Sequence, residues 1–148
     1  MPKLSIDDIH VKGRRVLVRL DLNVPLDDQG RIADDRRIQA ALPTVQKLLR
    51  DGGRLILISH LGRPKGDPQK DQRLTLEPIA GRLTHLLGQP VMFVPDCVGP
   101  EVQEKVKALR EGQCCVLENL RFREGETIKD AKAKGDPDLR SRKDQFAK

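Results

Sequence analysis

Four short runs of consecutive apolar residues stand out along the chain and alternate with more polar stretches. The runs lie at residues 16–18, 54–59, 91–94 and 114–117. Continuous apolar runs, in contrast to strictly alternating ones, are typical of strands in a parallel sheet that is covered on both faces. The pattern therefore predicts four strands of one parallel sheet.

Between these runs the apolar residues recur every three or four positions, as they do on one face of a helix. The helical stretches lie at residues 38–49, 79–87 and 102–109. The first is followed by Gly52 and Gly53, and Pro43 inside it predicts a kink or a helix whose regular part starts near the proline.

The other two helical stretches carry their own boundary signals. Thr75 is a candidate N-cap for the second, and Gly88 follows its last apolar residue. The third begins after Gly99-Pro100 and is left at Gly112. Residues 66–71 have the composition of an exposed loop.

Strands and helices thus alternate in the order β-α-β-α-β-α-β. This order predicts an α/β fold with right-handed crossovers, a doubly wound, Rossmann-like parallel sheet. The predicted elements all lie within residues 1–123, and 148 residues suit a single domain. Residues 124–148 are rich in Lys, Arg, Asp and Glu, so we expect a solvated helical or flexible segment there.

Composition narrows the range of partners. The formal net charge of +6 favours anionic ligands and would weakly attract nucleic acid. Aromatic residues make up only 2% of the chain, with no Trp and no Tyr, which is a poor supply of stacking surfaces for bases. We therefore expect a small anionic ligand and no nucleic acid.

The three cysteines, Cys97, Cys114 and Cys115, contain no C-x-x-C pair and have no metal-ligand spacing. We expect reduced thiols, with the adjacent pair pointing to opposite faces of a strand, and no metal site. The first residues lack the apolar segment of a signal peptide, and no apolar run approaches membrane-spanning length. The expected location is the cytoplasm.

Three polar clusters follow predicted strands at residues 19–26, 60–66 and 117–122. In an open parallel α/β sheet, ligands bind outside the carboxyl ends of the strands. We therefore expect the three clusters to converge on one side of the sheet and to form one anion-binding site.

The side chains in these clusters suit a small ligand with two anionic ends. Arginine presents a planar fork that binds carboxylate or phosphate, and the candidates are Arg19, Arg37, Arg63 and Arg121, together with His60. Asp21 and Asn23 can orient a hydroxyl group. A single arginine is more often a surface residue, however, and Asp21 and Asn23 could simply shape the turn before Pro25.

Taken together and in this order, the motifs resemble the amino-terminal half of the phosphoglycerate kinase family over residues 5–123. The motifs are Arg19-Leu20-Asp21-Leu22-Asn23-Val24-Pro25, Arg37-Ile38, residues 59–66 (Ser-His-Leu-Gly-Arg-Pro-Lys-Gly) and Leu117-Glu118-Asn119-Leu120-Arg121-Phe122. The resemblance implies an enzyme that interconverts ATP and 3-phosphoglycerate with ADP and 1,3-bisphosphoglycerate, in glycolysis. The family usually has Phe in place of Leu22 and a short acidic run after Phe122.

The resemblance also implies roles for individual residues. Asp21 and Asn23 would bind the 2-hydroxyl region of 3-phosphoglycerate, and Arg37 would act as the catalytic arginine at the reacting carboxyl end. His60, Arg63 and Arg121 would hold the 3-phosphate. Arg19, Leu22, Leu61 and Gly62 lie in the same motifs and are included among the expected substrate-binding residues.

The resemblance implies Mg-ATP or Mg-ADP as the second substrate and a monomeric full-length enzyme. No glycine-rich phosphate loop occurs in the sequence, so the nucleotide-binding domain is expected to be absent and no cofactor is expected to bind here. The chain would then be an incomplete domain, inactive alone. The alternative is a non-catalytic module that binds anions or nucleic acid through residues 124–148.

Overall fold

The structure is a computed structural model that describes residues 2–123, and its centre is a four-stranded parallel sheet. The strands pair in the order β1-β2-β4-β3, so the last strand in sequence lies between the second and the third. All four predicted strands and the α/β fold class are confirmed. The strands are β1 (Arg15–Arg19), β2 (Arg54–Ile58), β3 (Val91–Val94) and β4 (Cys114–Leu117).

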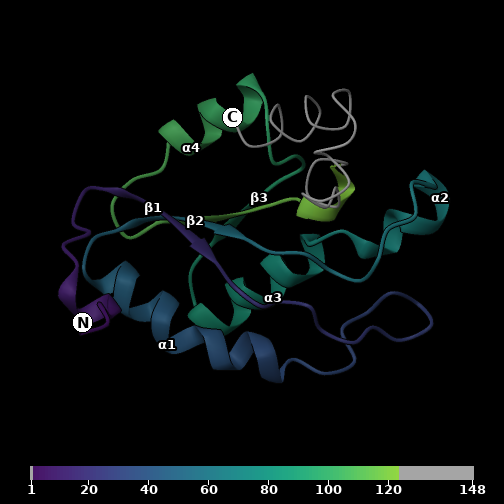
Figure 1. The fold of residues 1–148 in the computed structure, drawn as a ribbon, viewed down its shortest axis with the longest axis horizontal. Coiled ribbons are helices and arrows are strands. Elements are labelled where there is room, and N and C mark those ends of the chain that lie inside the picture. Colours follow the sequence, from purple (N-terminus) through teal and green to yellow (C-terminus); the bar gives the residue numbers. More distant parts are fainter. Residues whose placement is uncertain (1, 124–148) are drawn as a thin grey trace.

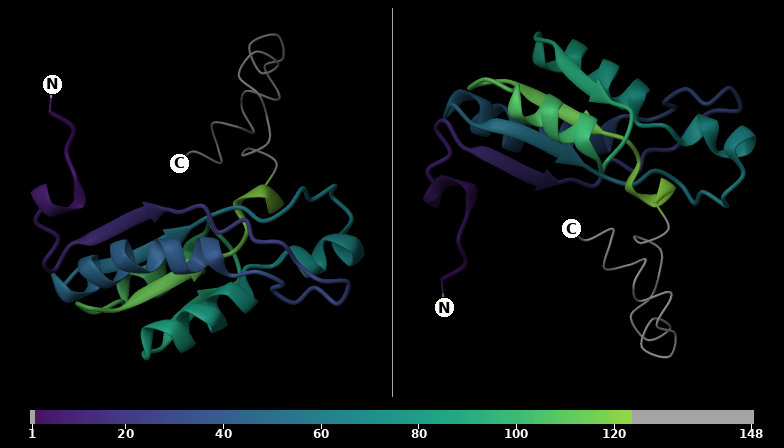
Figure 2. Two further views of the ribbon diagram at one scale, coloured as in Figure 1. Left: turned by 90° about the horizontal axis from the view of Figure 1, so that it is seen from below. Right: turned by 90° about the horizontal axis from the view of Figure 1, so that it is seen from above.

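Helices cover both faces of the sheet, as the doubly wound fold predicts. Figure 1 shows α4 (Pro100–Lys107) above the sheet and α1 (Arg36–Arg50) and α3 (Glu77–Leu87) below it. Seen from below, α1 lies across the strands with α3 beside it (Figure 2). The remaining elements are short: η1 (Ile6–Asp8), α2 (Pro68–Asp71), η2 (Gln72–Leu74) and η3 (Leu120–Phe122).

Two apolar layers result, one on each face of the sheet. The larger layer joins α1 and α3 to the sheet through residues such as Ile38, Leu57 and Leu83. Cys114 belongs to this layer, whereas its neighbour Cys115 belongs to the smaller layer under α4. The adjacent cysteines therefore point to opposite faces, as predicted, and all three cysteines are free thiols.

The α4 side of the sheet is less well covered at its β1 edge. Leu17 lies in register with Ile56, whose side chain packs in the layer under α4. Leu17 itself is 63% exposed, in a strand whose alternate residues Val16 and Val18 face the larger layer. The described part of the chain thus leaves one apolar side chain of the sheet open to solvent.

The first helix differs from one of its predicted forms. Helix α1 begins at Arg36 and continues through Pro43 to Arg50, so the alternative that its regular part begins near Pro43 is wrong. Pro43 is exposed, while Ile38 before it and Val45 after it are fully buried. Burial of both turns on the same core explains how the helix tolerates an interior proline, which removes one backbone hydrogen bond.

The connection from β2 to α3 also departs from the sequence-based prediction. Residues 66–71 do not form a continuous loop, because the Asp67 carboxylate caps the single turn α2 by accepting from the N–H groups of Gln69 and Lys70. The N-cap of α3 is Leu76 and not Thr75. The Thr75 hydroxyl still accepts from the N–H of Glu77, at 3.3 Å, and donates to the carboxylate of Glu118, at 2.7 Å.

The long connections after β1 and β2 extend beyond the same end of the sheet (Figure 1). The first contains a small antiparallel bridge between Leu26 and Ile32, and the second contains α2 and η2. The helical or flexible segment expected at residues 124–148 lies outside the described residues. No helix among residues 2–123 is long and apolar enough to cross a membrane.

Candidate functional site

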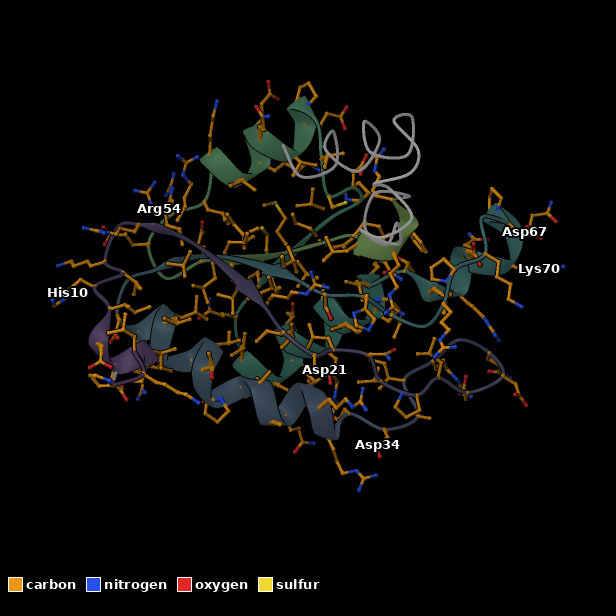
Figure 3. The ribbon with its side chains drawn as sticks, in the orientation of Figure 1. His10, Asp21, Asp34, Arg54, Asp67 and Lys70 are labelled. Atoms are coloured by element: carbon orange, nitrogen blue, oxygen red, sulfur yellow. The ribbon has the colours of Figure 1, made fainter. Side chains whose placement is uncertain are left out.

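The three polar motifs begin at the carboxyl ends of β1, β2 and β4, which are neighbours in the sheet. Figure 3 shows Asp21 just beyond the end of β1, with His10 and Arg54 toward the opposite end of the sheet. The predicted convergence of the motifs is therefore present in the fold. Hydrogen bonds show how closely the motifs are joined.

The first motif is joined to the start of α1 by Arg37. Its Nη1 atom donates to the backbone oxygen of Asn23, at 2.7 Å, and to Oδ1 of Asp21, at 3.2 Å. The Arg37 side chain nevertheless remains 53% exposed. One nitrogen of the fork is thus held by the protein, while the side chain still reaches solvent where an anion could bind.

The start of α1 is itself anchored to α3. The Asp35 carboxylate accepts from Nε of Arg82, at 2.7 Å, and from Nε2 of Gln39, at 2.8 Å. The hydrogen bond from Arg82 is the main cause that lowers the pKa of Asp35. Asp35 therefore stays ionised over the physiological range and fixes the turn that carries Arg37.

Gly62 joins all three motifs through its backbone. Its N–H donates to Oδ1 of Asn23, at 2.9 Å, and its carbonyl oxygen accepts from Nη1 of Arg121, also at 2.9 Å. Gly62 has a φ of +60°, and a Cβ there would lie 2.7 Å from Cδ2 of Leu74. Only glycine fits this position without strain and a clash.

Two fully buried polar residues, Ser59 and Asn119, form hydrogen bonds to the backbone of the loops that carry the motifs. Oγ of Ser59 accepts from the N–H of Leu22, at 3.1 Å, which ties the first motif to the second. The carboxamide of Asn119 bonds to Leu61, Leu74 and Arg121. Neither residue was assigned a role from the sequence. The available signal was the position of each polar residue, Ser59 at the end of one apolar run and Asn119 two residues after another.

The other expected site residues differ in exposure. Arg63 is exposed, Arg121 and His60 are half-buried, and Arg19 is an exposed residue at the end of β1. Leu22 and Leu61 are buried, at 0% and 2% exposure, so their side chains belong to the core. A ligand could reach these two leucines only through their backbone atoms.

A cavity of about 610 Å³ opens beside Arg121. Lys65 and Arg121 contribute positive charge to its wall, and Phe122 and two prolines contribute apolar surface. The loop on its other side is fixed by Asp71, whose carboxylate accepts from the N–H groups of Lys65, Gly66 and Asp67. The cavity therefore places Arg121 and Lys65 beside a loop that is held by backbone hydrogen bonds to Asp71.

None of the three thiols lines the cavity beside Arg121. Burial raises the pKa of Cys114 to about 12 and that of Cys115 to about 11, so neither is a nucleophile at neutral pH. Burial likewise raises the pKa of Cys97, which lies beside the Asp96–Arg123 ion pair. Among residues 2–123 no group of three His, Cys, Asp or Glu side chains could hold a metal ion.

Comparison with known proteins decides the family. The sequence model of phosphoglycerate kinase matches residues 6–148. The chain belongs to the phosphoglycerate kinase family. The match extends past residue 123, where our sequence-based resemblance ended, and includes the charged segment 124–148.

Individual relatives agree with the family match. The chain is 52% identical over 130 residues to phosphoglycerate kinase from Chlorobium limicola, which covers 88% of this chain and 32% of that protein. It is 53% identical over 134 residues to the enzyme from Frankia casuarinae, covering 86% and 33%. The chain thus spans about a third of the length of these phosphoglycerate kinase relatives.

Solved structures show the same fold. The crystal structure of phosphoglycerate kinase from Pyrococcus horikoshii superposes with a TM-score of 0.77 at 34% identity, covering 85% of this chain and 30% of that one. The structure of the Coxiella burnetii enzyme gives a TM-score of 0.68 at 34% identity, covering 93% and 33%. The parallel sheet described above therefore matches part of the fold of these two phosphoglycerate kinases.

Proposed function

We propose that this chain provides the 3-phosphoglycerate-binding part of a phosphoglycerate kinase. The whole enzyme would transfer a phosphoryl group between ATP and the carboxyl group of 3-phosphoglycerate, in glycolysis and in the cytoplasm, as a monomer. The observation that carries the proposal is the hydrogen-bonded path from Arg37 through Asn23 and Gly62 to Arg121. These hydrogen bonds join the motifs that carry the arginines, which supports a shared role in binding one anionic ligand.

Each side chain has a proposed task. Arg63, Arg121 and His60 would bind the 3-phosphate, because guanidinium and imidazole N–H groups donate to phosphate oxygens. Asp21 and Asn23 would hold the hydroxyl group. Arg37 would neutralise charge at the carboxyl end as the phosphoryl group is transferred, since such transfer depends mainly on positioning and charge stabilisation.

The described residues do not fit a magnesium nucleotide. Asp21, the acidic group nearest the arginines in the first motif, is paired with Arg37, and residues 2–123 hold no metal-binding cluster. We therefore assign the nucleotide and its metal to another part of the whole enzyme and derive no step through them. On this proposal the present chain binds 3-phosphoglycerate, the phosphoryl acceptor, and does not catalyse the reaction alone.

The rival proposal is an anion- or nucleic-acid-binding module that uses residues 124–148. Those residues lie outside the described part of the chain, so no contact there supports it. Binding to random oligonucleotides that falls steeply with salt and is indifferent to 3-phosphoglycerate would favour the rival.

Titration of the chain with 3-phosphoglycerate, followed by NMR shifts or calorimetry, tests the proposal. Arg63→Ala and Arg121→Ala should each weaken binding by about 1.5–3 kcal/mol, the usual contribution of a hydrogen bond to a charged group. Arg110→Ala is the matched control, because it removes the same charge from an exposed turn at the opposite end of β4. Equal affinities of all four proteins would overturn the site assignment.

A further inference from the structure

Asn119 is one of two buried polar residues among those the structure describes, and its side chain is 0% exposed. It lies two residues after the end of β4 and two residues before Arg121. A buried carboxamide needs partners for two N–H groups and two oxygen lone pairs, because water cannot supply them. The identity of those partners shows what the residue does.

All four hydrogen bonds of the Asn119 side chain go to backbone atoms near the site. Oδ1 accepts from the N–H of Leu61, at 3.3 Å, and from the N–H of Arg121, at 3.0 Å. Nδ2 donates to the carbonyl oxygens of Leu61, at 2.8 Å, and Leu74, at 2.9 Å. If the amide were rotated by 180°, Nδ2 would face the two N–H groups and Oδ1 would face the two carbonyl oxygens. The four partners therefore fix the orientation of the amide.

These bonds hold the residue before Gly62 at both its N–H and its carbonyl group. The carbonyl oxygen of Gly62 in turn accepts from Nη1 of Arg121, and its N–H donates to Oδ1 of Asn23. Oδ1 of Asn119 also accepts from the backbone N–H of Arg121, which fixes the backbone position from which the Arg121 side chain extends. One buried side chain therefore constrains the loop that carries His60 and Arg63 and the turn that carries Arg121.

We propose that Asn119 is a positioning residue for the anion site: it acts through Leu61 and Arg121 and does not touch the ligand. The inference rests on the proposed function for the identity of the ligand, 3-phosphoglycerate. The role of these hydrogen bonds in holding the loop can be tested without the ligand. Without Asn119, the loop at residues 60–63 should become mobile relative to the sheet.

Two variants separate this role from general stability. Asn119→Ser keeps a short side-chain oxygen that can cap η3 but cannot reach Leu61 and Leu74. Asn119→Asp keeps the size and the acceptor oxygen but removes both Nδ2 donors. The matched control is Thr84→Val, which loses a half-buried hydroxyl that bonds to Val91 and Ala80, away from the site loops.

Amide hydrogen exchange of the chain without ligand is the first measurement. In both Asn119 variants, exchange at Leu61 and Gly62 should rise at least tenfold relative to exchange at the β-strand amides of Leu57 and Val116. Thr84→Val should leave this ratio unchanged. An unchanged ratio in the Asn119 variants, or an equal change in Thr84→Val, would overturn the proposal, as would failure of both Asn119 variants to fold.

Affinity for 3-phosphoglycerate is the second measurement. Both Asn119 variants should bind roughly tenfold more weakly than the unsubstituted chain, the lower end of the losses seen when residues that orient metal ligands are removed. Thr84→Val should bind as the unsubstituted chain does. If the unsubstituted chain binds and the Asn119 variants bind equally well, this inference alone fails. If the unsubstituted chain does not bind, the proposed function fails, and the exchange ratio still decides whether Asn119 holds the loop.

Discussion

The carboxamide oxygen of Asn23 accepts a hydrogen bond from the N–H of Gly62, at 2.9 Å, across 39 residues of sequence. This oxygen is therefore already engaged by the protein. A ligand hydroxyl held by Asn23 would accept from Nδ2 and donate to the carboxylate of Asp21. Through this bond, the position of the first motif also depends on the conformation of Gly62.

The geometry at Gly62 predicts that Gly62→Ala is more harmful than an alanine at a comparable glycine. Both the positive φ and the 2.7 Å approach to Leu74 oppose a Cβ, so we expect the free energy of unfolding to fall by about 3 kcal/mol. Gly88→Ala is the control, because Gly88 has a φ of +68° with no atom near the added Cβ. It should lose only about 1–2 kcal/mol. Equal losses in urea unfolding would contradict the crowding argument.

The thiols should react in a fixed order. Cys97 is half-buried, whereas Cys114 and Cys115 are buried and have pKa values raised to about 12 and about 11. A disulfide reagent should modify Cys97 slowly in the native protein, faster at higher pH because only the thiolate reacts, and the other two only after unfolding. Cys97→Ser should abolish the native reaction, and a native reaction that persists in this variant would refute the assignment.

The Asp96–Arg123 pair should contribute stability that depends on pH. Burial acts to raise the pKa of Asp96, but the hydrogen bonds from Arg123 and the backbone outweigh it, so the pKa is lowered below 3.8. A lowered pKa means that the contribution is fully present well above pH 3.8 and is lost as the pH falls through the lowered value. Because the pair is partly exposed, we expect it to contribute less than about 1 kcal/mol.

Comparison of Asp96→Asn with the unsubstituted chain measures this contribution. The difference in unfolding free energy should be constant from pH 5 to pH 7 and should shrink toward zero in stronger acid. A difference that grows on acidification would show that the sign of the pKa shift is wrong.

The exposed Leu17 predicts self-association of this chain. β1 is an edge strand of the described sheet, and an exposed apolar side chain on an edge strand favours pairing with another chain. Leu17→Ser should shift light-scattering mass toward the monomer, with less than about 0.5 kcal/mol change in unfolding free energy. Leu4→Ser is the control, because Leu4 is 83% exposed but lies outside the sheet. An identical effect of both substitutions would exclude a role for the sheet edge.

Catalysis gives a negative prediction. Phosphoryl transfer needs donor, metal and acceptor held in line and shielded from water. On the proposed function the described residues bind only the acceptor, so the purified chain should not convert ATP and 3-phosphoglycerate above the buffer blank. Turnover that is lost in Arg37→Ala would disprove the proposal that the chain is inactive alone.

The sheet could be predicted because its signal is local. The apolar run at residues 54–59 is long enough to indicate a buried strand, and glycines at positions 52, 53 and 88 follow the ends of α1 and α3. Gly112 does not mark the end of the third helix, because α4 ends at Lys107 with Ala108 as its C-cap. The alternative that the regular part of the first helix begins near Pro43 was wrong. The burial of Ile38 and Val45 in the core outweighs the loss of one backbone hydrogen bond at the proline. Similarly, Asp67 and Asp71 turn an apparent loop into a capped helical turn through bonds to the backbone.

The site could be predicted only in part. The role of the arginines stays a prediction, made because positive charge near strand ends indicates anion binding. The supporting bonds were not predicted, because Asn119 acts on Leu61 across 58 residues and Ser59 on Leu22 across 37. Such pairings depend on which strands become neighbours, and the order β1-β2-β4-β3 cannot be read from apolar runs alone.

That strand order has a consequence for how the protein is made. Strand β3 pairs with β4 and with no other described strand, so it has no place in the sheet until the chain has been synthesised through Leu117. Because a domain generally folds as a unit, this sheet can be completed only after β4 has been synthesised. Asn119 and Arg121 then follow β4 within four residues. Completion of the sheet and of the proposed anion site should therefore occur at nearly the same moment of translation.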